Sequence, residues 1–387
     1  MTSPTSRCVV CRANRLTVGR PKMLDFTSTH YLGMQHASHT LAPWSALTTG
    51  VPAALYEVPG QRVLQADLAH LLNKQTTMLG VSTLHLFWDL FGLLADNDTA
   101  VYVDEYAYPI ARSAAERAVS RGGRLRTLPH HDVDLARQLI GNERSRRSII
   151  VTDGFCTACG KAAPLADYLH IAAQHSGLVV VDDTQALGVL GRLHGAADPL
   201  GIGGGGICAR QGATDRHLLT ISSMNKAFGV PLAVLGGSRD WLNWFQEHSE
   251  TRMHCSPPSL ANLHAGTAAL QRNRTHGDGL RSRLAGLIGQ FRRWARQIGI
   301  VPAGGYFPVQ SLPFRSLADA SALHADLLAQ GIRTVLRRLQ CGGRIGVSFV
   351  ITAAHQTHDI HAAVRALAGT LGRSSRFIQE PEHEYGI

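Results

Sequence analysis

The sequence lacks the long apolar runs that mark membrane-spanning helices. No stretch of about 18 or more uncharged apolar residues occurs, so a spanning helix is not expected. The opening segment, MTSPTSRCVVCRANR, contains no apolar core of a secretory signal peptide. No low-complexity tract interrupts a chain that is 44% hydrophobic and 17% charged. We therefore expect a globular, cytoplasmic protein with no membrane partner.

The sequence also lacks the basic stripe with interleaved aromatic residues that is typical of nucleic-acid-binding proteins. The formal net charge is +10 and the pI about 9.6, a balance that can indicate such a partner. The arginines are nevertheless scattered, apart from short clusters such as Arg333, Arg337 and Arg338. We interpret them as a basic solvated surface that would also suit anionic ligands, and expect no nucleic-acid partner.

The seven cysteines are odd in number and do not indicate a disulfide framework in a reducing compartment. Two pairs have C-x-x-C spacing: Cys8 with Cys11, and Cys156 with Cys159. Together they could offer four thiolates to zinc. The pairs lie far apart, however, and neither has the flanking turns of a zinc ribbon. The sequence therefore predicts no metal site, with a structural zinc as the less favoured alternative.

The length of 387 residues indicates two packed domains rather than one core. We expect an N-terminal arm over 1–45, a large domain over 46–290 and a smaller α+β domain over 291–387. The periodicity of apolar residues predicts helices over 61–74, 110–121, 164–176, 318–331 and 358–371, and another that starts near Ser82.

Apolar, β-rich runs alternate with the helices of the large domain. They are AVYVDE (Ala100–Glu105), SIIVTDG (Ser148–Gly154), GLVVVDD (Gly177–Asp183) and HLLTISS (His217–Ser223). Strands separated by helices predict an α/β fold, with a mainly parallel sheet between two layers of helices. Such sheets bind ligands at the C-terminal ends of their strands. In three of these four runs, the polar residues stand at the C-terminal end of the predicted strand.

Asp182 ends one of the predicted buried strands. An unpaired carboxylate is costly there, and a pyridinium nitrogen would be a suitable partner. The carboxylate would keep the ring of pyridoxal 5′-phosphate (PLP) protonated and able to accept electrons. Gln185, three residues later, could donate a hydrogen bond to the 3-oxygen of that ring.

Two further segments suit the same cofactor. Lys226, in SSMNKAFG after the next strand, could be desolvated, become nucleophilic and hold PLP as a Schiff base. The hydroxyl of Ser223 could bind a phosphate. Ser82 and Thr83, at a predicted helix start, would add free N–H groups and the helix dipole. Each feature alone has an ordinary explanation. Asp182 could be a loop carboxylate, Lys226 a solvated lysine, and Ser82 with Thr83 only the N-cap of a helix. Their order and spacing together favour the cofactor site.

Several stretches resemble, in order, the motifs of one family. VTDGFCTACGKAAPLADY resembles E-G-x-x-S-M-D-G-x-x-A-P-L, and VVVDDTQALGVLG resembles D-E-A-H-A-x-G-V-x-G. SSMNKAFG resembles T-x-S-K-A-x-G, and GRIGVSFVITAAH resembles R-I-x-x-S-A-x-H-T. From about Leu24 to Leu371 the chain resembles the α-oxoamine synthases, which are fold-type I PLP-dependent enzymes of the class I/II aminotransferase superfamily.

The resemblance implies roles for individual residues. Asp182 matches the partner of the pyridine nitrogen, Lys226 the Schiff-base lysine and Ser223 the hydroxyl residue that binds phosphate. Arg344 matches the arginine that grips the substrate carboxylate, for which its bidentate fork is suited. The family also implies a homodimer with a shared active site.

The chain departs from the family at two histidines. Tyr108, in DEYAYPI, stands where a histidine stacks on the cofactor ring, and Gln185 replaces the histidine of D-E-A-H. Tyr108 can still stack, as aromatic residues do in related aminotransferases, but neither side chain is an imidazole acid–base.

Three functions therefore stay open. The first is C-acyl transfer from an acyl thioester, on coenzyme A or a carrier protein, to a small amino acid, and the order of the motifs favours it. The second is transamination or another reaction at the α-carbon, which Tyr108 favours. The third is a PLP-fold protein that has lost catalysis and serves in binding. The retained Asp182, Lys226 and Arg344 argue against the third.

Overall fold

The structure of the protein, a computed structural model, describes residues 23–143, 146–195, 198–339 and 341–371. Residues 1–22 of the predicted N-terminal arm, with the pair Cys8 and Cys11, lie outside the described residues. None of the described helices combines the length and apolar character needed to cross a membrane.

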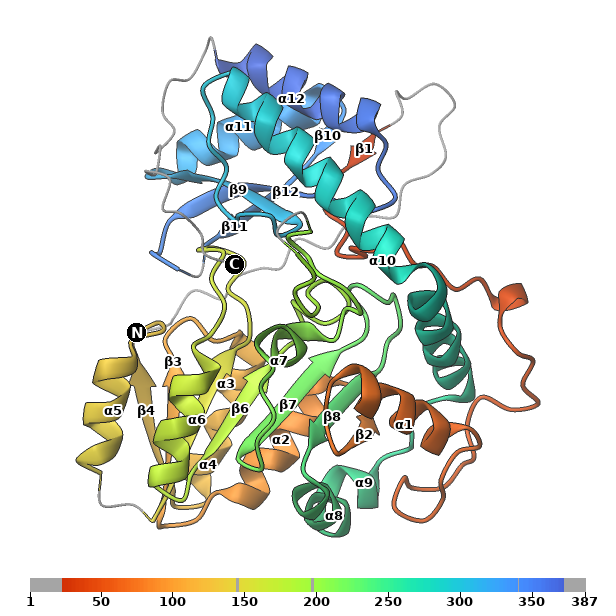
Figure 1. Ribbon diagram of the computed structural model, residues 1–387, viewed down its shortest axis with the longest axis vertical. Helices are drawn as coiled ribbons and strands as arrows, with labels where there is room; N and C mark the ends of the chain where they lie inside the picture. Colours follow the sequence, from red (N-terminus) through yellow and green to blue (C-terminus); the bar gives the residue numbers. More distant parts are fainter. Residues whose placement is uncertain (1–22, 144–145, 196–197, 340, 372–387) are drawn as a thin grey trace, which may run out of the picture.

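A seven-stranded sheet forms the centre of the large lobe, which consists of this sheet and the helices packed on it (Figure 1). The strand order is β2-β8-β7-β6-β5-β3-β4. β3 to β7 run parallel, whereas β8 is antiparallel to both of its neighbours. This confirms the predicted α/β fold with a mainly parallel sheet. The strands are β2 (Thr76–Gly80), β3 (Thr99–Asp104), β4 (Arg124–Leu128), β5 (Arg147–Asp153), β6 (Leu178–Asp182), β7 (Leu218–Ser223) and β8 (Ala233–Gly237).

Helices cover both faces of this sheet because the side chains of its strands alternate between the faces. In β3, Val101 and Val103 join one buried apolar cluster, and Ala100 and Tyr102 join the other. The first cluster packs against α2 (Thr83–Leu94), α3 (Pro109–Ala115), α4 (Arg117–Ser120) and α8 (Arg239–His248). The second packs against α1 (Gln61–Leu71), α5 (Val133–Gly141), α6 (Leu165–Gln174) and α7 (Gly206–Gln211).

The small lobe consists of an antiparallel sheet in the order β11-β12-β9 and the helices α11 and α12. Its elements are β9 (Val309–Phe314), α11 (Leu317–Ala329), β11 (Val335–Arg338), β12 (Ile345–Val350) and α12 (Thr357–Leu371). The short strand β1 (Leu24–Asp25) pairs in parallel with β10 (Ile332–Arg333), so the first described residues attach beside this lobe. A 3-10 turn (Ser38–Thr40) follows β1, and α9 (Glu250–His254) follows α8.

The helix α10 (Leu260–Gln297) joins the two lobes and is 38 residues long (Figure 1). It continues past residue 290, where the boundary between the domains is predicted, so that division stays a prediction. Other elements also differ from the sequence prediction. The helix predicted over 110–121 is divided into α3 and α4. The structure also has elements that the sequence does not predict, among them the strands β2, β4, β8, β9, β10 and β11 and the helices α5, α8, α9 and α10.

Candidate active site

Polar side chains gather where the parallel strands of the large lobe end. Asp153 ends β5, Asp182 ends β6 and Ser223 ends β7. Asp153 and Asp182 are register partners, and β7 pairs with β6 on the other side. Because carboxyl ends of parallel strands share one edge of a sheet, these groups meet at the site where such folds bind ligands.

A cavity of about 240 Å³ opens at this edge. It brings together most of the residues that the sequence singles out, although they come from four separate segments. Ser82 and Arg344 are not among the lining residues of this cavity. The cavity is lined by Thr29, Thr83, Tyr108, Ile110, Asp153, Asp182, Thr184, Gln185, Ser223, Asn225 and Lys226.

Asp182 is a buried carboxylate at the floor of this cavity, with 6% of its surface exposed. It accepts a hydrogen bond of 3.0 Å from the backbone N–H of Thr184. The Thr184 hydroxyl in turn accepts one of 2.9 Å from the backbone N–H of Ser223. Burial raises the pKa of Asp182, and the nearby Lys226 opposes that rise. Asp182 is thus held in place and is suited to a cationic partner.

Lys226 also lines this cavity, and its Nζ atom lies 5.9 Å from the centre of the Tyr108 ring. Burial lowers the pKa of Lys226, and the charge of Arg337 lowers it further, while Asp182 and Asp153 act in the other direction. A lowered pKa increases the neutral fraction of the amine, which is the nucleophilic form.

Tyr108 and Gln185, the residues that replace the two family histidines, both line the cavity. Tyr108 is 44% exposed and precedes α3, and its backbone N–H donates to Asp153 Oδ1 over 2.9 Å. Gln185 accepts a hydrogen bond of 2.8 Å from the hydroxyl of Tyr31. That bond uses the amide oxygen, so the amide N–H groups of Gln185 remain able to donate. The bond predicted from Gln185 to the 3-oxygen stays a prediction.

The predicted phosphate-binding groups lie at the start of α2 and at the end of β7. Ser82 is the N-cap of α2, and its hydroxyl accepts from the backbone N–H of His85. Thr83, the first residue of the helix, lines the cavity. Ser223 Oγ accepts from the backbone N–H of Asn225 and can still donate its own proton. Within the described part of the chain, the buried hydroxyl of Ser222 has no hydrogen-bond partner.

A second arginine, besides the one that the sequence indicates, acts electrostatically on this site. Arg344 directly precedes β12, at the β11–β12 hairpin, and its backbone carbonyl accepts from Leu339. Arg337, on β11, is the arginine whose charge acts on Lys226 and on the buried Tyr31. The role predicted for Arg344 stays a prediction. Arg337, which is likewise not among the residues that line the cavity, is a second candidate because its charge acts on Lys226.

Arg337 is held by several neutral hydroxyl groups. Its Nε atom donates to Ser348 over 3.2 Å, and its Nη atoms lie 3.4 Å from Thr157 Oγ1. These distances are long for a charged donor, whose bonds to carboxylates measure about 2.7–2.9 Å. Arg337 is thus oriented without being neutralised by these contacts. No sequence pattern indicates a role for Arg337, because its effect on Lys226 depends on how the small lobe packs against the large one.

Among curated proteins, the chain is similar to two 8-amino-7-oxononanoate synthases. It is 26% identical to the protein of Alcanivorax borkumensis over 361 residues, which cover 91% of this chain and 90% of the relative. It is 27% identical to that of Halorhodospira halophila over 369 residues, which cover 92% and 88%. A comparison with models of protein families gives no match.

Solved structures show the same fold. The serine palmitoyltransferase of S. paucimobilis, with bound PLP and myriocin, superposes with a TM-score of 0.79 over 90% of this chain and 87% of that one. The sequence identity is 13%. The chain therefore has the PLP-dependent α-oxoamine synthase family fold, as the motifs in its sequence predict.

Proposed function

We propose that this protein is a PLP-dependent transferase that joins a small amino acid to an acyl group delivered as a thioester of coenzyme A or a carrier protein. One observation carries the proposal: a buried carboxylate, Asp182, and a lysine of lowered pKa, Lys226, face one cavity at the carboxyl edge of the sheet. The similarity to proteins named as 8-amino-7-oxononanoate synthase and serine palmitoyltransferase supports the acyl-transfer reaction.

The residues present fit PLP. Asp182, whose pKa is raised by burial, would be stabilised by pairing with the pyridinium N–H. Lys226 would hold the aldehyde carbon, Tyr108 would stack on the ring and Gln185 would donate to the 3-oxygen. The hydroxyl groups of Ser82, Thr83 and Ser223 would bind the phosphate. Bound PLP supplies an electron sink for charge that develops at the substrate α-carbon.

The remaining steps fall to side chains of the protein. The Arg337 guanidinium would bind the substrate carboxylate and orient the α-carbon toward Lys226. The Lys226 amine would then accept the α-proton, which its lowered pKa favours at neutral pH. Because Tyr108 and Gln185 carry no imidazole, Lys226 is the one amine that the cavity lining offers for this transfer.

The products should distinguish this reaction from transamination, the alternative favoured by Tyr108. We expect the PLP-loaded protein, given a panel of small amino acids and acyl thioesters, to release one free thiol and one C-acylated product per turnover. That product is a 2-amino-3-oxo acid if the carboxylate is kept, or an aminoketone together with CO₂ if the carboxylate is lost. Stoichiometric keto acid and pyridoxamine phosphate would instead support transamination. If protein that is shown to contain PLP forms none of these products, the result would favour a binding protein without catalysis. Mass spectrometry and a thiol assay measure these outcomes.

We propose that the protein works as a homodimer with a shared active site. Large apolar side chains are exposed on the segment before α1 and on α2, namely Leu55, Tyr56, Leu84 and Trp88, with Leu55 77% exposed. Clustered apolar surface commonly marks an interface between proteins. Light scattering after size exclusion should give twice the chain mass. A single-chain mass at working concentration would contradict the dimer.

A further inference from the structure

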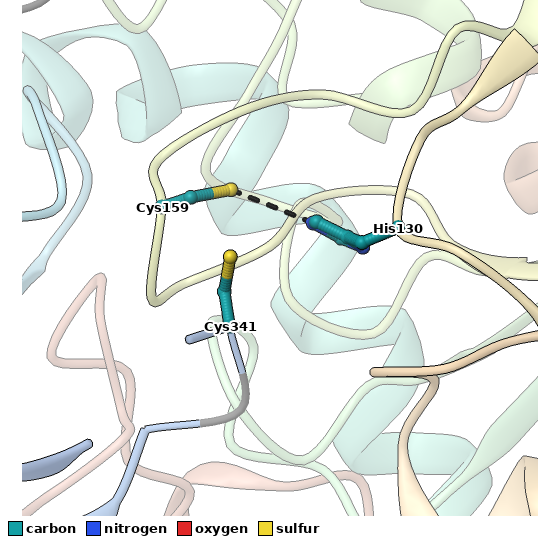
Figure 2. Close-up of side chains that lie close together, drawn as sticks. All are labelled: His130, Cys159 and Cys341. Carbon is teal, nitrogen blue, oxygen red and sulfur yellow. Dashed lines mark hydrogen bonds between the residues drawn. The ribbon is translucent and has the colours of Figure 1, made fainter. Parts of the chain in front are cut away.

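One histidine and three cysteines lie together outside the cavity described above. His130 Nε2 is 3.5 Å from the Sγ atom of Cys159. The ligand atoms of His130, Cys159 and Cys341 all lie within 4.8 Å of one another, and Figure 2 shows both sulfur atoms turned toward the imidazole ring. The buried Cys156 packs in one small cluster with Cys159 and Cys341. Three thiols and one imidazole therefore gather in one place, with the ligand atoms of His130, Cys159 and Cys341 closest together.

The spacing of these atoms suits a tetrahedral metal ion. Zn²⁺ binds thiolate at about 2.3 Å and imidazole at about 2.0–2.1 Å, so its ligand atoms stand roughly 3.5–3.8 Å apart. The observed 3.5 Å between Cys159 Sγ and His130 Nε2 lies in this range. Small side-chain rotations would bring the other sulfur atoms to the same spacing. A Cys₃His set is typical of structural zinc sites.

A buried carboxylate already orients the histidine for such a role. The Nδ1 atom of His130 lies 2.9 and 3.0 Å from the two carboxylate oxygens of Asp104, which is 2% exposed at the end of β3. Asp104 also accepts hydrogen bonds from the backbone N–H groups of Tyr106 and His131. Metal-binding histidines usually donate their second nitrogen to a carboxylate in this way, which leaves Nε2 for the metal. Asp104 thus orients a ligand and is not itself one.

The four side chains come from three distant segments. His130 follows β4, and Cys156 and Cys159 lie in a turn after β5, closed by the bond from the Gly160 N–H to the Cys156 carbonyl. Cys341 lies in the hairpin between β11 and β12, in the small lobe. Leu339 and Ala158 pack against the sulfur atoms and shield them from water. Such an apolar shell restricts solvent access to a metal site.

We infer that His130, Cys156, Cys159 and Cys341 bind one structural Zn²⁺ ion that clamps the β11–β12 hairpin onto the large lobe. Binding releases thiol protons to solvent and changes no oxidation state. Four protein ligands leave no position for water or substrate, so the site is structural and not catalytic. Thiolate ligands exclude Mg²⁺ and Ca²⁺, which prefer oxygen.

The clamp has a consequence for the cavity. Arg337 lies four residues before Cys341, and Asp153 lies three residues before Cys156. The ion would therefore fix the two chain segments that carry the proposed carboxylate-binding arginine and one wall of the cavity. We expect loss of the metal to loosen the position of Arg337, and to raise the KM for the amino acid more than it lowers kcat.

Metal content tests the inference without any turnover, so its failure is distinguishable from failure of the proposed function. The full chain is expressed without a polyhistidine tag, purified under reducing conditions and measured by mass spectrometry of the elements. About one zinc per chain is expected. The single variants Cys159→Ser and Cys341→Ser should each lose most of it. Asp104→Asn should weaken zinc affinity by about 10- to 100-fold, measured against a chromophoric chelator.

Two variants serve as matched controls. Cys255→Ser changes a partly buried cysteine remote from the cluster, and Cys8→Ser with Cys11→Ser removes the other C-x-x-C pair. Both should keep the zinc. Circular dichroism checks that each variant is folded. Replacement of zinc by Co²⁺ should give sulfur-to-cobalt charge transfer and the intense d–d bands of a tetrahedral site, and Cys159→Ser should lose them.

Several results would overturn the inference. The first is wild-type protein that stays metal-free after incubation with zinc. The second is zinc that remains in the folded Cys159→Ser and Cys341→Ser variants. The third is a Cys156–Cys159 disulfide in protein purified with reductant, because oxidised sulfur cannot act as thiolate ligand.

Discussion

Replacing Lys226 by alanine is expected to lower kcat by about 10²–10⁴-fold or more, because the variant lacks the amine proposed to move the α-proton. The variant should also lose the covalent link to PLP. Borohydride reduction of the wild-type holoenzyme, followed by peptide mass spectrometry, should place a phosphopyridoxyl group on the peptide that contains Lys226. The absorbance band of the protonated Schiff base should be absent from the variant.

The control for this experiment is Lys74→Ala. Lys74 follows α1 and lines a separate cavity with Asp215 and Ser238. This variant should keep both the absorbance band and the borohydride adduct. A band that persists in Lys226→Ala, or an adduct on another lysine, would show that Lys226 does not hold the cofactor.

Replacing Arg337 by glutamine is expected to raise the KM for the amino acid roughly 10- to 150-fold. The reason is that hydrogen bonds to charged groups contribute about 1.5–3 kcal/mol each, and about 1.4 kcal/mol corresponds to a factor of ten. Arg337→Lys should fall between wild type and glutamine, because it keeps the charge but loses the bidentate fork. Steady-state kinetics for the amino acid measure these changes.

The pH dependence gives a second readout for Arg337. Its charge lowers the pKa of Lys226, so removing it should raise that pKa and reduce the neutral amine near pH 7. The rate at which the apoenzyme captures PLP should then rise with pH over a higher range in Arg337→Gln than in wild type. A purely structural role for Arg337 would not predict this shift.

Arg344→Gln is the matched comparison, because Arg344 is the arginine that the family motif indicates. We expect it to change the KM far less than Arg337→Gln does. The opposite pattern, with a large effect at Arg344 and a small one at Arg337, would restore the assignment made from the sequence. It would also mean that the β11–β12 hairpin moves when substrate binds.

Short-range patterns in the sequence determine much of this site. Asp182 and Lys226 follow apolar runs whose composition requires buried strands, so their place at the sheet edge follows from strand polarity alone. Ser82 is identified as an N-cap by its position directly before a periodic apolar segment, and the structure agrees. Each of these features depends only on residues within one strand or one helix turn.

The contacts between the lobes are decided by the tertiary structure. Tyr31 donates to Gln185 across 154 positions of the sequence, and the charge of Arg337, on the sheet of the small lobe, lowers the pKa of Lys226. The sequence shows Cys156 and Cys159 as a pair but does not show His130 and Cys341 beside them. Hydrophobic periodicity reports which face of an element is buried, not which distant element covers it. The packing of α10, β1 and β10 determines which distant elements meet. The positions of the proposed carboxylate-binding arginine and of the proposed metal site depend on that packing.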